Sequence, residues 1–247
     1  MKNGNMKVCV CGNFGSGKKS VINALLGKRI LKISATPCYY ANTLELIYAD
    51  TPRVEFELWK GNNTREAIQQ EYSLFDKEFE TGKYNSNHID ELKIFYPIDS
   101  LKGIEILLLG TLDDNPGPYF DITKSKYASK LAECDVVIYV MNVCYCWTME
   151  DLRKLQILQN MGIKNIIVVL THWDFIDKTD YSKVLHFCNE NINKFCISQD
   201  LCFCVNGYKA TQAIEQNDTE AYSKTGFPEF ERFLTNYYIK LRSEEKR

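Results

Sequence analysis

A glycine-rich segment near the start of the chain has the residue types and spacing of a phosphate-binding loop. Residues 12 to 18 read GNFGSGK, which fits the pattern G-x-x-x-x-G-K. The segment follows an apolar run at Lys7–Cys11, a predicted buried strand, and opens a predicted helix at Lys18–Leu26 that Gly27 ends. Backbone N–H groups in this context can surround a phosphate, and the lysine can reach the β and γ phosphates of a nucleotide. The predicted nucleotide-binding residues of this loop are Gly12, Asn13, Phe14, Gly15, Ser16, Gly17, Lys18, Lys19 and Ser20. A strand-to-helix turn without a ligand is the alternative.

The position after the loop lysine departs from the pattern. A Ser or Thr there normally binds Mg²⁺ through its hydroxyl, but this chain has Lys19. Ser20 comes one residue too late and points elsewhere on a helix. An ammonium group cannot bind Mg²⁺, although it can place a fixed positive charge near the phosphates. We therefore expect Mg²⁺ binding to be weakened, replaced or lost.

A second group of candidate residues follows the predicted strand Ile104–Leu109. The loop Gly110–Pro118 contains the sequence DNPG at residues 114 to 117. A P-loop enzyme needs an Asp near Mg²⁺ and the γ-phosphate, which makes Asp114 the candidate metal ligand, and Gly117 can offer its N–H to that phosphate. Together with Lys18, these two residues are the predicted catalytic group. An acidic turn is the alternative, because this composition also favours turns, and the connection from the strand to Asp114 is longer than expected.

Two later strands end in residues that can recognise a nucleotide base. The predicted strand Ile163–Leu170 leads into Thr171, His172 and Asp174. A carboxylate can accept two hydrogen bonds from guanine N1–H and N2–H₂, an edge that adenine lacks, so Asp174 predicts selection of guanine. A helix cap is the alternative function of this Asp. After the predicted strand Leu201–Val205, the residues Asn206 and Gly207 are candidates to complete the base pocket.

Apolar strands alternate with helical patterns along the rest of the chain, which predicts an α/β fold with a mostly parallel sheet and helices on both faces. The further predicted strands are Thr43–Tyr48, Val54–Trp59 (joined to the first by a turn at Asp50–Arg53), Leu92–Tyr96 and Val136–Asn142. The further predicted helices are Arg65–Phe79 capped by Thr64, Ile122–Ala132, a Thr148-capped helix to Met161, Tyr181–Asn193, and Glu229–Leu241 opened by Pro228. We expect a single domain over residues 1–247 with a C-terminal helix at about 228–243.

The composition narrows the class of protein. With a formal net charge of -2, the chain shows no basic excess, and nucleic acid is not an expected partner. It has no apolar run near the roughly 20 residues that span a bilayer and no signal-peptide pattern, so we expect a cytoplasmic protein with reduced thiols. Its 10 cysteines include three C-x-C pairs, which we interpret as small buried hydrophobes. The alternative is a metal cluster drawn from His186, Cys188, Cys196, Cys202 and Cys204.

These residues together resemble the GTPase (G) domain of the dynamin superfamily, especially bacterial dynamin-like proteins, from about Lys7 to about Leu241. The stretches that carry the resemblance are residues 12–27 (GNFGSGKKSVINALLG), 96–106 (YPIDSLKGIEI), 114–117 (DNPG), 132–142 (AECDVVIYVMN) and 166–174 (IIVVLTHWD). The resemblance implies a P-loop NTPase fold that binds GTP and GDP. It also implies pairing of G domains across the nucleotide, in a homodimer or a heterodimer.

Several positions differ from the family pattern. Gly15 replaces the usual Ser, Lys19 replaces the first Ser of G-K-S-S, and His172 replaces the Lys that packs on guanine. The best alignment places residues 38–40 (CYY) where the family has the P-T-T of its first switch. Because hydrolysis needs a metal ion and a positioned water, we expect nucleotide binding to be better preserved than turnover.

Three functions stay open from the sequence. The chain is an active GTPase with unusual metal coordination, or a pseudo-GTPase that acts as an interaction or regulatory module for a larger dynamin-like partner. An ATP-dependent P-loop kinase or ATPase is the third, and Asp174 argues against it. We predict no stalk, no transmembrane domain and no membrane insertion by this chain itself, so contact with a membrane would be peripheral and through a partner.

Overall fold

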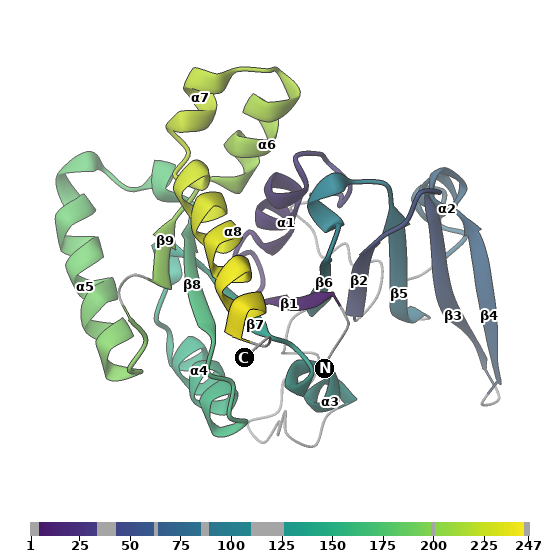
Figure 1. The fold of residues 1–247 in the computed structure, drawn as a ribbon, viewed down its shortest axis with the longest axis horizontal. Helices are drawn as coiled ribbons and strands as arrows, with labels where there is room; N and C mark the ends of the chain where they lie inside the picture. Colours follow the sequence, from purple (N-terminus) through teal and green to yellow (C-terminus); the bar gives the residue numbers. More distant parts are fainter. Residues whose placement is uncertain are drawn as a thin grey trace. The chain divides into compact units, whose positions relative to one another are not determined.

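The fold was examined in a computed structural model, which describes residues 5–33, 43–61, 64–84, 89–109, 126–198 and 201–244. The described chain divides into two compact units. The first unit comprises Gly12–Lys32 and the chain from Val136 onward, and the second comprises the segments up to Cys11 and from Ile33 to Asp135. Figure 1 gives the labels of the helices and strands.

The second unit is a mixed sheet with the strand order β4-β3-β5-β2-β6-β1. Its strands are β1 (Met6–Cys11), β2 (Thr43–Tyr48), β3 (Arg53–Gly61), β4 (Thr64–Glu71), β5 (Ile89–Tyr96) and β6 (Ile104–Leu109). Its helices are α2 (Tyr72–Glu80), the short η2 (Asp99–Leu101) and α3 (Lys126–Ala132). The pairs β1–β6 and β2–β5 are parallel, whereas β2–β6, β3–β5 and β3–β4 are antiparallel.

The predicted helix Arg65–Phe79 is wrong over its first half. Residues 64–71 form β4, which pairs antiparallel with β3, so that Phe56 lies opposite Ile68. The edge of β3 offers a ladder of backbone hydrogen bonds, and this pairing overrides a helical propensity that burial does not reinforce, because most of these side chains are exposed. The helix α2 begins only at Tyr72 and buries Phe75, whose ring centroid lies 5.2 Å from that of Phe56.

The two strands predicted on either side of the turn at Asp50–Arg53 are present, but they are not neighbours. The strand β5 lies between β2 and β3 and pairs with both. A local hydrophobic pattern shows where a strand forms and does not show which strand it pairs with.

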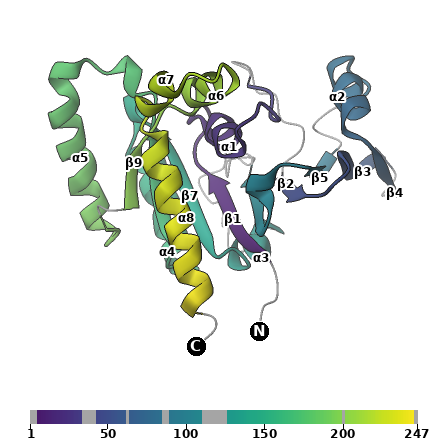
Figure 2. The same ribbon diagram turned by 45° about the horizontal axis from the view of Figure 1, so that its top comes forward.

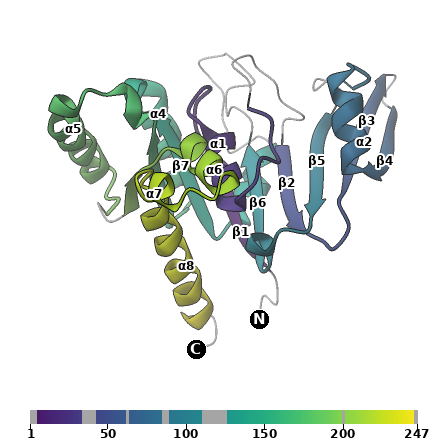
Figure 3. The same ribbon diagram turned by 90° about the horizontal axis from the view of Figure 1, so that it is seen from above.

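The first unit is built on three parallel strands, β7 (Val136–Asn142), β8 (Ile166–Thr171) and β9 (Cys202–Cys204). All residues of β8 are buried, as expected for a strand covered on both faces. The helix α4 (Met149–Asn160) lies on one face of these strands and α8 (Phe227–Glu244) on the other, as Figures 1 and 3 show. The remaining helices are α1 (Lys18–Leu26), η4 (Val143–Tyr145), η5 (Trp173–Phe175), η6 (Lys178–Asp180), α5 (Tyr181–Lys194), α6 (Gly207–Glu215) and α7 (Thr219–Ser223).

Most elements of the first unit match the prediction closely. Thr148 caps α4, accepting a hydrogen bond from the Asp151 N–H while the Asp151 carboxylate accepts one from the Thr148 N–H. The helices α6 and α7 were not predicted. Figure 2 shows α6 beside α1, and Gly207 explains this contact, because a Cβ there would lie 2.6 Å from the carbonyl oxygen of Ser20. The two helix backbones therefore meet directly at this glycine.

The α/β fold with parallel strand pairs in both units is confirmed, and α8 covers the predicted C-terminal helix. Within the described residues, none of the helices has the length and apolar character needed to span a lipid bilayer. That the chain is one G domain stays a prediction.

Candidate nucleotide-binding site

The loop between β1 and α1 has a backbone that only glycine can form at two positions. Gly12 has φ 143°, and a Cβ there would lie 2.1 Å from the carbonyl oxygen of Val140 in β7. Gly17 has φ 88° and caps the N-terminus of α1, and a Cβ there would lie 3.2 Å from Thr171 Oγ1. The glycines of the pattern are therefore needed for the loop to fit between β7 and β8. Phe14 and Gly15 lie at the outer end of the loop, and the Phe14 side chain is exposed.

Two side chains of the phosphate loop are suited to binding an anion. Lys18 is buried, and its Nζ donates to the carbonyl oxygens of Gly12 at 2.9 Å and Asn13 at 2.8 Å. Ser16 is buried as well, and its hydroxyl finds no hydrogen-bond partner among the described residues. A phosphate could bind both groups and the N-terminus of α1, because all three offer positive charge or hydrogen-bond donors. The loop therefore fits the phosphate chain of a nucleotide.

The second residue of the loop is held by a polar network from α4. Asn13 Nδ2 donates to Asp151 Oδ1 at 2.7 Å, and Lys154 Nζ donates to Asn13 Oδ1 at 2.5 Å. Asp151 is 1% exposed and also accepts from the Tyr139 hydroxyl at 3.0 Å and the Thr148 hydroxyl at 2.7 Å. Sequence reasoning missed these residues as part of the site. From the sequence, Thr148 is predicted only to cap the helix that contains Asp151 and Lys154.

The position that should bind Mg²⁺ does not fit the ion. Lys19 Nζ donates to the carbonyl oxygen of Lys32 at 3.1 Å, so its ammonium group is tied to the segment that follows α1. An ammonium group carries no oxygen that could bind Mg²⁺ in place of the missing hydroxyl. The other predicted residues, Asp114 and Gly117, lie outside the described residues, as do residues 38–40. We therefore derive no reaction step through a metal ion.

Thr171 connects the end of β8 to the phosphate-binding loop. Its hydroxyl lies 2.7 Å from the carbonyl oxygen of Ser16, 3.2 Å from that of Met141 and 2.7 Å from Nδ1 of His172. Because both carbonyls can only accept, this arrangement favours an imidazole that carries its proton on Nδ1 and donates it to Thr171. The base loop and the phosphate loop are thus held together by one hydroxyl.

His172 has a backbone conformation that is rare outside glycine, with φ 63°. Its ring stacks on that of Phe175 with centroids 5.9 Å apart, and burial lowers the pKa of its imidazole. A neutral imidazole at neutral pH follows. The residue therefore presents a flat, uncharged ring where the family has a lysine.

Asp174 is oriented by the loop after β9. Asn206 Nδ2 donates to Asp174 Oδ1 at 2.9 Å, and Lys209 Nζ lies 3.0 Å from Asp174 Oδ2. Asn206 Oδ1 in turn accepts from the Lys209 N–H at 3.0 Å and caps α6. The predicted base residues Thr171, His172, Asp174, Asn206 and Gly207 are therefore brought together, with Lys209 as an addition that the sequence did not indicate. Gly207 contributes the close packing of α6 on α1 described above.

The alternative interpretation of the cysteines, a metal cluster, finds no support in the described residues. No group of three or more His, Cys, Asp or Glu side chains there is arranged to hold a metal ion. Cys9 and Cys11 are fully buried in the second unit, which agrees with their interpretation as small buried hydrophobes. The interpretation is wrong for Cys144, which is exposed, and Cys146, Cys202 and Cys204 are only partly buried.

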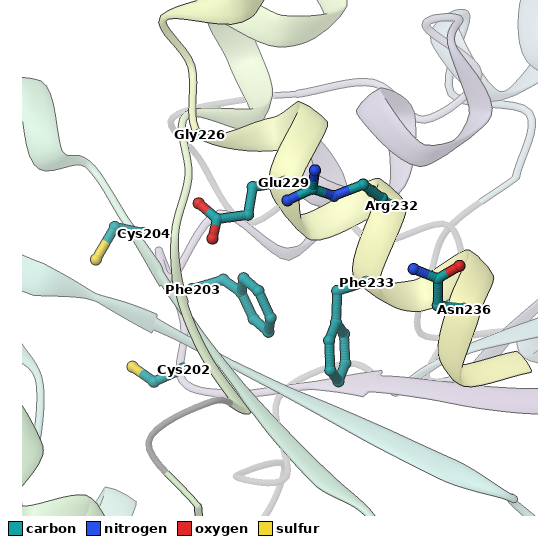
Figure 4. Close-up of a pocket in the computed structure, with 8 residues that line it drawn as sticks. All are labelled: Cys202, Phe203, Cys204, Gly226, Glu229, Arg232, Phe233 and Asn236. Carbon is teal, nitrogen blue, oxygen red and sulfur yellow. The ribbon is translucent and has the colours of Figure 1, made fainter. Parts of the chain in front are cut away.

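A cavity of about 540 Å³ lies between β9 and α8. In Figure 4 the ring of Phe203 faces α8, where it packs on Phe233, whereas the sulfur atoms of Cys202 and Cys204 point away from that helix. The lining residues are Cys202, Phe203, Cys204, Gly226, Glu229, Arg232, Phe233 and Asn236. The cavity shares no residue with the phosphate loop or the base loop, and it is a separate feature of the first unit.

A glycine-rich loop that opens a helix, joined through Thr171 to the loop after β8, is the arrangement of the P-loop class of proteins. A model of the dynamin family matches residues 8–173, which is more than half of the chain. The chain belongs to the dynamin family.

Relatives of known description agree with this family. The chain is 24% identical to dynamin-like protein 1 of Campylobacter jejuni, over 93% of this chain and 37% of that protein. It is 22% identical to the bacterial dynamin-like protein of Nostoc punctiforme, over 98% of this chain and 38% of that protein. The chain thus spans less than two fifths of the length of these relatives.

A solved structure of an oligomerised bacterial dynamin pair, described as a mechanism for long-range sensing and tethering of membranes, has a similar fold. It superposes with a TM-score of 0.74 at 22% sequence identity, over 95% of this chain and 38% of that one. A likeness at this identity supports the fold, and the predicted dynamin-type α/β fold with a large, mostly parallel sheet flanked by helices is confirmed.

Proposed function

We propose that this G domain binds GTP and GDP, with the phosphates on the Gly12–Ser20 loop and guanine on Asp174. The observation that carries the proposal is the hydrogen bond from Thr171 to the Ser16 carbonyl, which joins the base loop to the phosphate loop. Membership of a GTPase family supports it independently. In the proposed complex, Lys18 turns from the loop carbonyls to the phosphates, and the Ser16 hydroxyl gains an acceptor.

Asp174 is prepared to recognise guanine. Asn206 and Lys209 fix its carboxylate, which reduces the entropy that an incoming base must overcome. Guanine would displace Asn206 or Lys209 from the carboxylate and donate two hydrogen bonds to it. The neutral imidazole of His172 would take the position beside the base that a lysine stem has in the family pattern.

Slow or absent hydrolysis is part of the same proposal. The Lys19 ammonium replaces a metal-binding hydroxyl, and it is tied to the Lys32 carbonyl. Without that ligand, the charge that develops on the phosphates during hydrolysis loses part of its stabilisation. This observation also favours a second candidate, a pseudo-GTPase that uses its nucleotide-binding fold as an interaction or regulatory module. Slow phosphate release during incubation with GTP would identify a weak GTPase, and GTP binding without phosphate release would identify the pseudo-GTPase.

The substitution Asp174→Asn tests base recognition by a gain of function. An amide offers one acceptor and one donor, which suits xanthine with its N1–H donor and C2 carbonyl, whereas guanine presents two donors. We expect Asp174→Asn to weaken GDP binding at least about tenfold and to strengthen binding of xanthosine diphosphate, measured by competition against a fluorescent nucleotide.

The control is Asp177→Asn, a change of an exposed carboxylate three residues away that accepts hydrogen bonds from Thr179. It should leave both affinities unchanged. Equal binding of guanine and xanthine nucleotides by wild type and Asp174→Asn would contradict the assignment of the base site.

Self-association through the nucleotide face belongs to the proposal, by resemblance to the family. Large exposed hydrophobic side chains occur on the loops and helix starts that follow the strands of the first unit and on the phosphate loop. They are Phe14, Tyr145, Met149, Phe175 and Tyr208. Apolar groups that gather on functional loops favour a partner surface, here a second copy or a larger dynamin-like protein. Contact with a membrane would then pass through the partner.

A further inference from the structure

Two cysteines from separate elements of the first unit bring their sulfur atoms together. Cys146 follows η4, Cys188 lies in α5, and their Sγ atoms are 3.9 Å apart. Both are free thiols. We propose that Cys146 and Cys188 are a redox site, at which hydrogen peroxide forms a reversible disulfide.

The surroundings of the pair favour reaction between these two thiols. Cys188 is fully buried, whereas Cys146 is partly exposed and is the sulfur that a small oxidant can reach. The Cys146 thiol also lies 3.3 Å from the carbonyl oxygen of Val143, which holds it in place at the end of η4. A disulfide needs a sulfur–sulfur distance of about 2.05 Å, so the pair has to close by roughly 2 Å.

The electrostatics of the pair support one shared negative charge. The hydrogen bond with the Cys146 thiol lowers the pKa of Cys188, burial opposes this shift, and the nearby indole of Trp147 lowers the pKa further. The hydrogen bond with Cys188 raises the pKa of Cys146. The Trp147 N–H is buried and has no hydrogen-bond acceptor among the described residues. A thiolate at this pair would attract that N–H. After loss of one proton, the two sulfurs therefore share the proton that remains.

The nearby cysteines are less suited to the reaction. The sulfur atoms of Cys202 and Cys204 point away from α8, as Figure 4 shows, and burial raises the pKa of both thiols, that of Cys202 to about 12. Neither sulfur has a hydrogen bond to a second thiol among the described residues, unlike those of Cys146 and Cys188. Cys144 is exposed and lies two residues before Cys146, which makes it the matched control.

The reaction balances with peroxide as the oxidant. The shared proton moves to Cys188, and the Cys146 thiolate attacks one peroxide oxygen, breaking the O–O bond to give a sulfenic acid and hydroxide, which takes up the proton released earlier and becomes water. The Cys188 sulfur then attacks the Cys146 sulfur, and its proton leaves with the hydroxyl group as a second water. Two thiols and one peroxide thus become one disulfide and two waters, and a dithiol reductant reverses the change.

Peptide mapping of the full chain tests the site without any nucleotide. Reduced protein is treated with hydrogen peroxide, the remaining thiols are blocked with N-ethylmaleimide, and unreduced proteolytic peptides are analysed by mass spectrometry. We expect a peptide pair linked through Cys146 and Cys188, two fewer free thiols than in reduced protein, and full recovery with dithiothreitol. Cys144→Ser should give the same linked pair.

The variant Cys146→Ser should keep its circular dichroism spectrum and lose the linked pair, and Cys188→Ser should lose it as well. The mapping of the wild type decides the question even if the buried Cys188→Ser variant fails to fold. Oxidation confined to Cys144 or Cys196, or links only between separate molecules, would overturn the proposal.

Discussion

Thr171 is a small side chain with a large structural effect, because its hydroxyl joins the phosphate loop, β7 and His172 through contacts of 2.7 Å, 3.2 Å and 2.7 Å. Sequence reasoning placed Thr171 in the base loop and could not foresee this contact, because Ser16 lies 155 positions earlier in the chain. Both loops could be identified from their residue types and spacing alone. The bond between them depends on the alignment of two strands that no local pattern encodes.

A buried imidazole at the base loop predicts a pH dependence of stability. Burial lowers the pKa of His172 below its ordinary value of 6.5, so the unfolded chain binds the proton more readily than the folded one. The contribution of the neutral ring to stability is present above about pH 6.5 and is lost as the pH falls towards the folded-state pKa. We expect His172→Asn, which keeps a residue suited to φ 63°, to show a smaller fall in melting temperature between pH 7.5 and pH 5.5 than wild type.

The control for this prediction is His186→Gln. His186 is an exposed histidine on α5 whose Nε2 lies 3.5 Å from Glu190. That variant should keep the pH dependence of the wild type. An unchanged pH dependence in His172→Asn would mean that this imidazole is not the group that titrates.

At the scale of elements, the contact of α6 with α1 depends on a single glycine. A Cβ at Gly207 would lie 2.6 Å from the Ser20 carbonyl oxygen and 2.8 Å from the Val21 nitrogen. Both atoms belong to a helix backbone and cannot turn aside. We expect Gly207→Ala to lower the free energy of unfolding by about 3 kcal/mol, measured by urea denaturation.

The variant Gly162→Ala separates the effect of steric overlap on stability from the effect of backbone strain. Gly162 has φ 79° and nothing within 4 Å of its Cβ position, so Gly162→Ala should cost only about 1 kcal/mol for its left-handed conformation. Equal effects of the two variants would show that α6 does not rest on α1 through Gly207.

Elements with a strong local signal were predictable, and elements fixed by tertiary contacts were not. The Thr148 cap and the strand β8 were predicted, although the strand begins at Ile166 instead of Ile163, because the information for both lies within a few residues. The segment 64–71 became a strand through pairing with β3, and this pairing is not visible in its own sequence. The same limit applies to the site, since Asp151 and Lys154 contact Asn13 across 138 and 141 positions of sequence.

At the scale of the whole molecule, the proposed G-domain pairing can be tested by measuring whether the chain sediments as a monomer or as a dimer. We expect a nonhydrolysable GTP analogue to shift the wild-type chain towards a dimer in sedimentation velocity measurements, and the double variant Tyr145→Ser, Met149→Ser to reduce that shift. Both side chains are exposed, 71% and 81%, so their replacement should leave the fold intact. Ile239→Ser on α8 is the control, an exposed hydrophobic residue away from these loops. A monomer under all conditions would contradict the pairing.

The central claim, a guanine-nucleotide site with altered metal dependence, is tested most directly by calorimetry of GTP and GDP binding with and without Mg²⁺, for wild type and Lys19→Ser. We predict that wild type binds both nucleotides with little dependence on Mg²⁺ and releases phosphate slowly or not at all. Lys19→Ser, which restores the metal-binding hydroxyl, should gain a dependence on Mg²⁺. Absence of guanine-nucleotide binding by a folded wild-type chain would contradict the account, and an unchanged Mg²⁺ dependence in Lys19→Ser would contradict its metal argument.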